Sequence, residues 1–126
     1  MHQQAASAYQ QISKQTINPR DLEANLLSRS AANLQRIREN WEDYRHELPE
    51  ALKFNGKLWN VFLASVTGPD NPLPQPIRQN IANLGIFVLS QTARIQDGPD
   101  AKKLDVLINI NRELAAGLRA APKVAA

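Results

Sequence analysis

The sequence predicts an all-α protein that folds as a small bundle of about five helices. Apolar residues recur at spacings of three and four along most of the chain, which is the period of a helix with one buried face. No sustained alternation of apolar and polar residues indicates a strand. Prolines and glycines divide the chain into segments of helical length. Because 126 residues suffice for one hydrophobic core, we expect a single helical domain over residues 1–126.

The first two helices are predicted from their caps and their apolar spacing. A short helix is expected near residues 3–15, and a longer one near residues 19–45. Asn18 is suited to cap the second helix, and Pro19 is suited to its first position because its ring already holds a helical φ. We expect this second helix to bend or end near Trp41.

Proline-rich segments separate the three remaining helices. A third helix is predicted near residues 49–67, and the segment "TGPDNPLPQP" that follows it is a linker with four of the eight prolines. A fourth helix is predicted near 74–96 and a fifth near 99–119, with the break "DGPD" at 97–100. A proline then cuts off a flexible tail at about 120–126.

Asparagines interrupt the apolar faces of the last three predicted helices. Asn55, Asn80 and Asn111 each fall within such a face. A buried amide without a partner costs about 1–3 kcal/mol, so we expect these side chains to be hydrogen-bonded. Two sets of partners fit: a core polar network that fixes the register of the bundle, or the backbone of a peptide bound in a groove.

The helix predicted at 74–96 is apolar nearly all round between Leu84 and Leu89. Ile86 and Leu89 extend onto the side away from Leu84 and Val88. Lesser second stripes occur at Phe54 and Val61 in the third helix and at Val106 and Ile110 in the fifth. A helix with one solvent-exposed side normally carries polar residues on that side. Either this helix is the central rod of the bundle, or its second face binds another chain.

The sequence carries little that indicates catalysis or metal binding. It has no cysteine, and His2 and His46 have no companions at ligand spacing, so we expect no metal and no cofactor. Neither a phosphate-binding loop nor a nucleophile motif is present, which disfavours an enzyme. Fifteen basic and 12 acidic residues give a net charge of +3, and their scatter disfavours a nucleic-acid footprint.

A cytoplasmic location is the default expectation for this composition. No apolar run approaches the roughly 18 residues that a membrane span needs. The opening residues "MHQQAASAYQQ" lack the basic and then apolar layout of a secretory signal.

Three segments of the chain resemble one known family. The segments "ALKFNGKLWNVFLASV", "NPLPQPIRQNIANLGIFV" and "KLDVLININRELAAGLR" are similar, in this order and spacing, to FlaF, a flagellar biosynthesis regulator of alphaproteobacteria. The likeness runs from about Asn18 to Arg119. It implies a non-enzymatic assembly factor that is needed for flagellin synthesis and export, acts with FlbT and binds flagellin as a chaperone-like partner. It implies no catalytic residue.

The second apolar stripes suggest where such a partner binds. The expected contact residues are Ile86, Leu89, Val106 and Ile110, with Arg78 and Arg112 as charges at the rim. The alternative function is an RNA-binding regulator of flagellin messenger RNA. Salt separates the two, because binding led by phosphate contacts weakens steeply with salt and binding in an apolar groove does not. The oligomeric state is not predicted.

Overall fold

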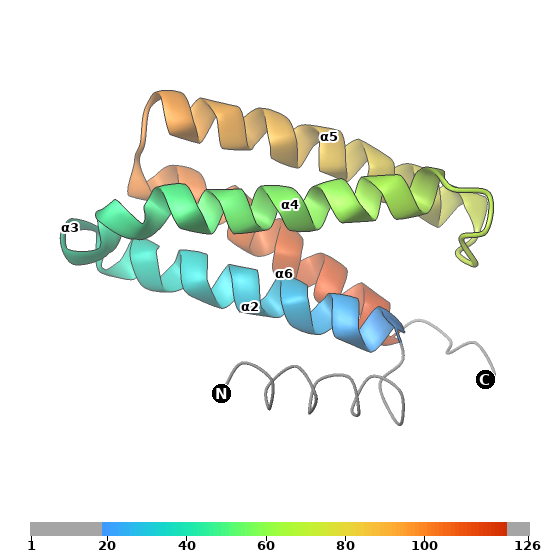
Figure 1. Ribbon diagram of the computed structural model, residues 1–126. Helices are drawn as coiled ribbons and strands as arrows, with labels where there is room; N and C mark the ends of the chain where they lie inside the picture. Colours follow the sequence, from blue (N-terminus) through green and yellow to red (C-terminus); the bar gives the residue numbers. More distant parts are fainter. Residues whose placement is uncertain (1–18, 121–126) are drawn as a thin grey trace, which may run out of the picture.

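The computed structural model describes residues 19–120, which form four long helices and three short helical segments (Figure 1). In chain order these are α2 (Pro19–Glu39), α3 (Trp41–Tyr44), η1 (Arg45–Glu47), α4 (Leu48–Thr67), α5 (Gln75–Asp97), η2 (Ala101–Lys103) and α6 (Leu104–Ala120). No strand occurs between residues 19 and 120, so the predicted all-α class is confirmed. The helix predicted at 3–15, the Asn18 cap and most of the predicted tail lie outside the described residues.

The break expected near Trp41 lies one residue earlier. Helix α2 ends at Glu39, and Asn40 leaves the helical conformation with φ −128° and ψ 51°. The Asn40 side chain donates a hydrogen bond from Nδ2 to the carbonyl oxygen of Arg36, at 3.1 Å, which satisfies one of the last carbonyls of α2. The short helices α3 and η1 then turn the chain into α4.

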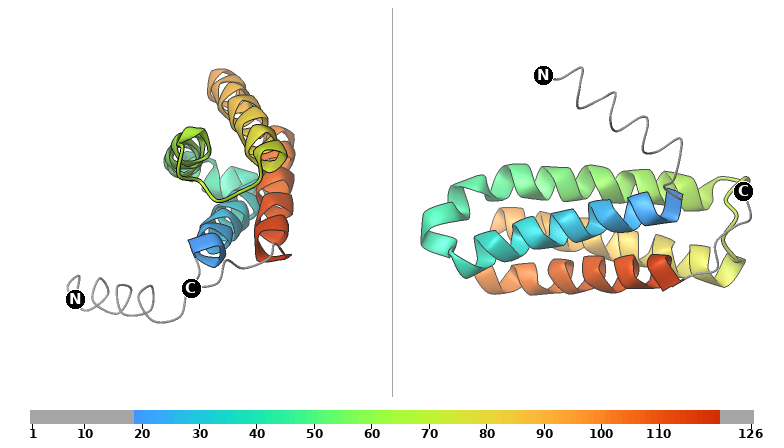
Figure 2. Two further views of the ribbon diagram at one scale, coloured as in Figure 1. Left: turned by 90° about the vertical axis from the view of Figure 1, so that its right-hand side faces the viewer. Right: turned by 90° about the horizontal axis from the view of Figure 1, so that it is seen from below.

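The long helices pack as two antiparallel pairs, in which α2 lies beside α6 and α4 lies beside α5. Both views in Figure 2 show α2 and α6 side by side. Helix α4 also contacts α2, whereas α5 has far fewer contacts with α6 than with α4. Helix α5 is therefore held mainly by one neighbour.

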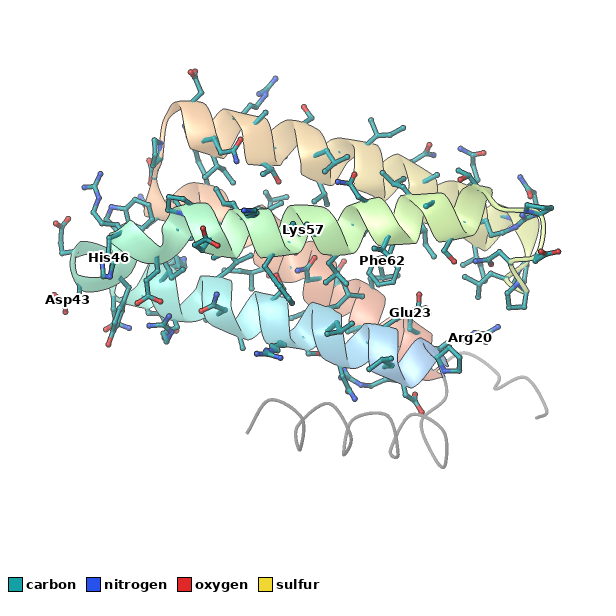
Figure 3. The ribbon with its side chains drawn as sticks, viewed as in Figure 1. Arg20, Glu23, Asp43, His46, Lys57 and Phe62 are labelled. Atoms are coloured by element: carbon teal, nitrogen blue, oxygen red, sulfur yellow. The ribbon has the colours of Figure 1, made fainter. Side chains whose placement is uncertain are left out.

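Apolar side chains from all four long helices fill the space between them. Trp59 and Ile37 are fully buried, as are Val88 and Leu104. The rings of Trp59 and Phe62 meet edge to face, with centroids 5.6 Å apart. Figure 3 shows Phe62 pointing from α4 toward α2. This burial supplies the main driving force of folding.

Two ion pairs connect α2 to other elements at one end of the bundle. Arg38 contacts Asp105 at the start of α6, and Arg36 contacts Glu47 in η1. Hydrogen bonds from these guanidinium groups hold the pKa of both carboxyl groups below their ordinary values. At the other end of α2, burial raises the pKa of Glu23, and nearby Arg20 partly offsets this effect.

Candidate partner-binding surface

A buried chain of hydrogen bonds joins α2, α4 and α6. The indole Nε1 of Trp59 donates to Oδ1 of Asn111 at 2.9 Å, and Nδ2 of Asn111 donates to Oδ1 of Asn55 at 2.7 Å. The hydroxyl of Ser30 donates to the same Asn55 oxygen at 2.9 Å. Asn55 and Asn111 thus lie in a core network, as in the first of the two expected arrangements.

Two members of this network were not predicted from the sequence. Ser30 lies three residues after Leu27 and four before Leu34, so its helical spacing places it on the buried face of α2. Trp59 lies four residues after Asn55, so its helical spacing places it on the buried face of α4. Each supplies a donor that can meet a buried amide oxygen, and this shared chemistry is the signal that identifies them.

The prediction for Asn80 is wrong, because this side chain is exposed on α5 and has no place in the network. Helix α5 is rotated relative to the face that its apolar residues suggested. Its buried residues are Ile81, Gly85, Val88, Thr92 and Ile95. Asn80, Ile77 and Phe87 turn outward as a result, and Ile77 and Phe87 are each 42% exposed.

Gly85 permits a close approach of α5 to α4 in this orientation. A Cβ atom placed on Gly85 would lie 2.6 Å from Cδ2 of Leu63 on α4, so only glycine lets the two helices come this close without rearrangement. The buried hydroxyl of Thr92 is satisfied within the helix by donating to the carbonyl oxygen of Val88 at 2.7 Å. The buried side of α5 is thus the side that packs closely against α4.

The structure does not gather the predicted contact residues on one surface. Ile86 is 65% exposed, and Leu89 is half-buried one helical turn after Gly85, on the side of α5 that faces α4. Val106 and Ile110 are half-buried and pack against the core from α6. Asp105 and Arg112 mark the α2 side of α6, and Val106 and Ile110 lie on its other side.

The two predicted rim arginines also differ in their surroundings. Arg78 is half-buried on α5 and donates a hydrogen bond to Gln75, while its Nε is buried with no partner. Arg112 is exposed on α6, and its Nη1 lies 3.5 Å from Oε1 of Gln35 on α2. Only Arg78 lies on the same helix as Ile86.

The exposed apolar side chains of the described residues gather on one helical hairpin. The large hydrophobic residues that remain exposed are Phe54 and Val61 on α4 and Ile77, Ile86 and Phe87 on α5. The exposure of Ile86 contradicts the interpretation of α5 as a central rod. We name residues 48–97, from the start of α4 to the end of α5, the α4–α5 hairpin.

A shallow hollow of about 270 Å³ opens at the end of the bundle near α3. Its lining consists of Trp41, Arg45, Leu48, Pro49, Leu52, Gln96 and Pro99. These residues offer neither a nucleophile nor a carboxylate, and the guanidinium of Arg45 lies over the Trp41 ring at 5.5 Å. Residues 19–120 contain no group of three or more His, Cys, Asp or Glu residues that could hold a metal ion.

The fold defines the class of the protein as a small antiparallel helical bundle, and its exposed large apolar side chains lie on α4 and α5. None of the helices in residues 19–120 has both the length and the apolar character needed to cross a bilayer. A family model described as flagellar protein FlaF matches residues 5–118. The chain therefore belongs to the FlaF family and is a flagellar protein. Neither a curated protein nor a solved structure matches the chain.

Proposed function

We propose that this flagellar protein is a chaperone-like adaptor that binds flagellin and acts with FlbT in flagellin synthesis and export. The observation that carries the proposal is the exposure of Ile86, an apolar side chain in the middle of α5 that no other part of the described structure covers. An apolar helical surface can cover an amphipathic helix of a partner such as flagellin and so delay the self-association of that partner.

The centre of the proposed surface is Ile86, with Leu89 beside it. Ile86 is 65% exposed although it lies in the middle of a long helix. Full burial of an isoleucine side chain contributes about 1.5–3 kcal/mol, so a partner that covers it gains substantial binding energy. The other predicted contacts, Val106 and Ile110, already pack against the core and have less area to offer.

Capture of flagellin by the full chain tests the proposal. We expect the wild-type protein to retain flagellin, and the Ile86→Asp and Leu89→Asp variants to retain at least tenfold less, because each introduces an unpaired charge at an apolar contact. Ala116→Asp is the matched control, since it adds the same charge at an exposed position of α6. Circular dichroism verifies that each variant is folded.

The outcomes separate the function from its location. If the wild-type chain does not capture flagellin, the proposed function is wrong. Undiminished capture by both hairpin variants rejects this surface and leaves the function standing. Size-exclusion chromatography with mass measurement of the chain with flagellin, with FlbT and with both then gives the composition of the complex.

A further inference from the structure

Charge is distributed unevenly between the two halves of the bundle. Residues 51–69 and 71–96 contain no acidic side chain, and Asp70 is the one acid between Glu50 and Asp97. The same stretch contains four cations, namely Lys53, Lys57, Arg78 and Arg94. The ion pairs among the described residues involve α2, η1 and α6, and none involves α4 or α5. Residues 48–97 together carry four cations and three acids, so the α4–α5 hairpin has a net charge of +1, with its acids at the two ends of the segment and in the linker.

Two of these cations lie on the outer side of α4. Lys53 and Lys57 are four residues apart, so they share one side of the helix, and both are exposed. Figure 3 labels Lys57 near the middle of α4. Their neighbours Asn55 and Trp59 point into the core, which places the lysine side of α4 toward the solvent.

The register of the hairpin fixes how far Ile86 lies from these lysines along the helix axes. Gly85 of α5 lies level with Leu63 of α4, because the two meet in close contact. At a rise of about 1.5 Å per residue, Lys57 lies about 9 Å and Lys53 about 15 Å from that level along α4. From the level of Ile86 toward the start of α4, the hairpin therefore presents first Lys57 and then Lys53.

A partner that fits this surface carries apolar and acidic residues in the matching order. Its apolar side chains would cover Ile86, and its carboxylates would lie about two and three helical turns away, against Lys57 and Lys53. Exposed ion pairs add little affinity, but they raise the association rate and select the partner that carries the opposite charge. A basic partner of the same shape would meet like charge.

We infer that the α4–α5 hairpin binds an acidic amphipathic helix, with apolar residues over Ile86 and carboxylates facing Lys57 and Lys53. This inference rests on the proposed function in one respect, namely that the hairpin is the docking surface. It adds the chemical class of the bound segment and its direction along α4.

Two synthetic helical peptides test the inference with the full chain. Both carry one leucine stripe, flanked by glutamates in the first peptide and by lysines in the second. Fluorescence anisotropy should show the glutamate peptide binding at least tenfold more tightly. The Lys53→Glu/Lys57→Glu variant should reverse this order, and Ile86→Asp should abolish binding of the glutamate peptide. The control Arg29→Glu/Arg119→Glu makes the same charge change at exposed positions of α2 and α6 and should preserve the order.

Equal binding of the two peptides, or an order unaffected by the lysine reversal, would overturn the inference. Tight binding of an RNA oligonucleotide that depends on Lys53 and Lys57 and is indifferent to Ile86→Asp would also overturn it. Flagellin capture by the wild-type chain without charge-ordered peptide binding would leave the proposed function intact and remove this inference. If the glutamate peptide binds more tightly than the lysine peptide but the chain does not capture flagellin, the inference stands and the proposed function is wrong.

Discussion

Trp59 sets the direction of the buried hydrogen bonds, because an indole N–H can donate and cannot accept. It therefore requires the oxygen of Asn111, which turns Nδ2 of Asn111 toward Asn55. Asn55 must present its own oxygen in return, and its Nδ2 is left buried with no partner in the structure. One aromatic donor thus fixes both amide orientations and leaves one unmet donor in the core.

Replacing Asn111 by alanine should lower the free energy of unfolding by about 2–4 kcal/mol, because the Trp59 donor and the Asn55 oxygen both lose a buried partner. Chemical denaturation followed by circular dichroism measures the change. Asn109→Ala on the exposed side of α6 is the control, and it should change stability by less than about 0.5 kcal/mol. Helix propensity favours alanine over asparagine, so a stability of Asn111→Ala equal to or above that of the wild type would show that the network contributes nothing.

At the scale of the helices, the two glycines within α5 and α6 have different surroundings. Gly85 lies against Leu63, and Gly117 has no atom within 4 Å of the position that a Cβ would take. Glycine in a helix costs about 1 kcal/mol relative to alanine, so its presence at Gly85 is compensated by close packing. The same compensation is not available at Gly117.

A matched pair of substitutions tests this difference. Gly117→Ala should raise the free energy of unfolding by about 0.5–1 kcal/mol through helix propensity alone. Gly85→Ala should lower it, because the added methyl group overlaps the half-buried Leu63 side chain, which must leave its packed position. Thermal or urea unfolding compares the two. In a Leu63→Ala background the Gly85→Ala change should become stabilising, and a loss that persists there would mean that Leu63 is not the cause.

Helix ends could be predicted from the sequence more closely than helix orientation. The helix predicted at 49–67 is observed as Leu48–Thr67, because prolines and glycines act on the local backbone. The orientation of α5 depends on a neighbour instead. Its apolar residues cover a wide arc, and the approach of Leu63 to Gly85 selects which part of that arc is buried.

The dependence of helix orientation on neighbouring helices also explains why two of the three asparagines were placed correctly and the third was not. Asn55 and Asn111 were placed correctly because the apolar faces of α4 and α6 each have a clear centre, and both residues lie there. Asn80 was misplaced because the centre of α5 shifts toward Gly85 and Thr92, two residues that a count of apolar side chains undervalues. The exposure of Ile77 and Phe87 follows from the same shift.

Across the whole molecule, the polar side-chain interactions between long helices join three of the four, namely α2, α4 and α6. The buried network joins α2, α4 and α6, and the Arg38–Asp105 pair adds a second connection between α2 and α6. The side-chain hydrogen bonds of α5 in the described part of the chain stay within that helix. The helix that carries Ile86 is thus the one with the fewest connections.

Native-state hydrogen exchange should therefore resolve α5 from the rest of the bundle. We expect amides near the middle of α5 to exchange through a partial opening that costs at least about 1–2 kcal/mol less than the opening of α2 and α6, since apolar contact with α4 is the main interaction that holds α5. Asn111→Ala should weaken protection in α2 and α6 more than in α5, because α5 is absent from the network. If α5 amides exchange with the same free energy as those of α2 and α6, the bundle opens as one unit and the proposed interaction surface lies on a helix as firmly held as the others.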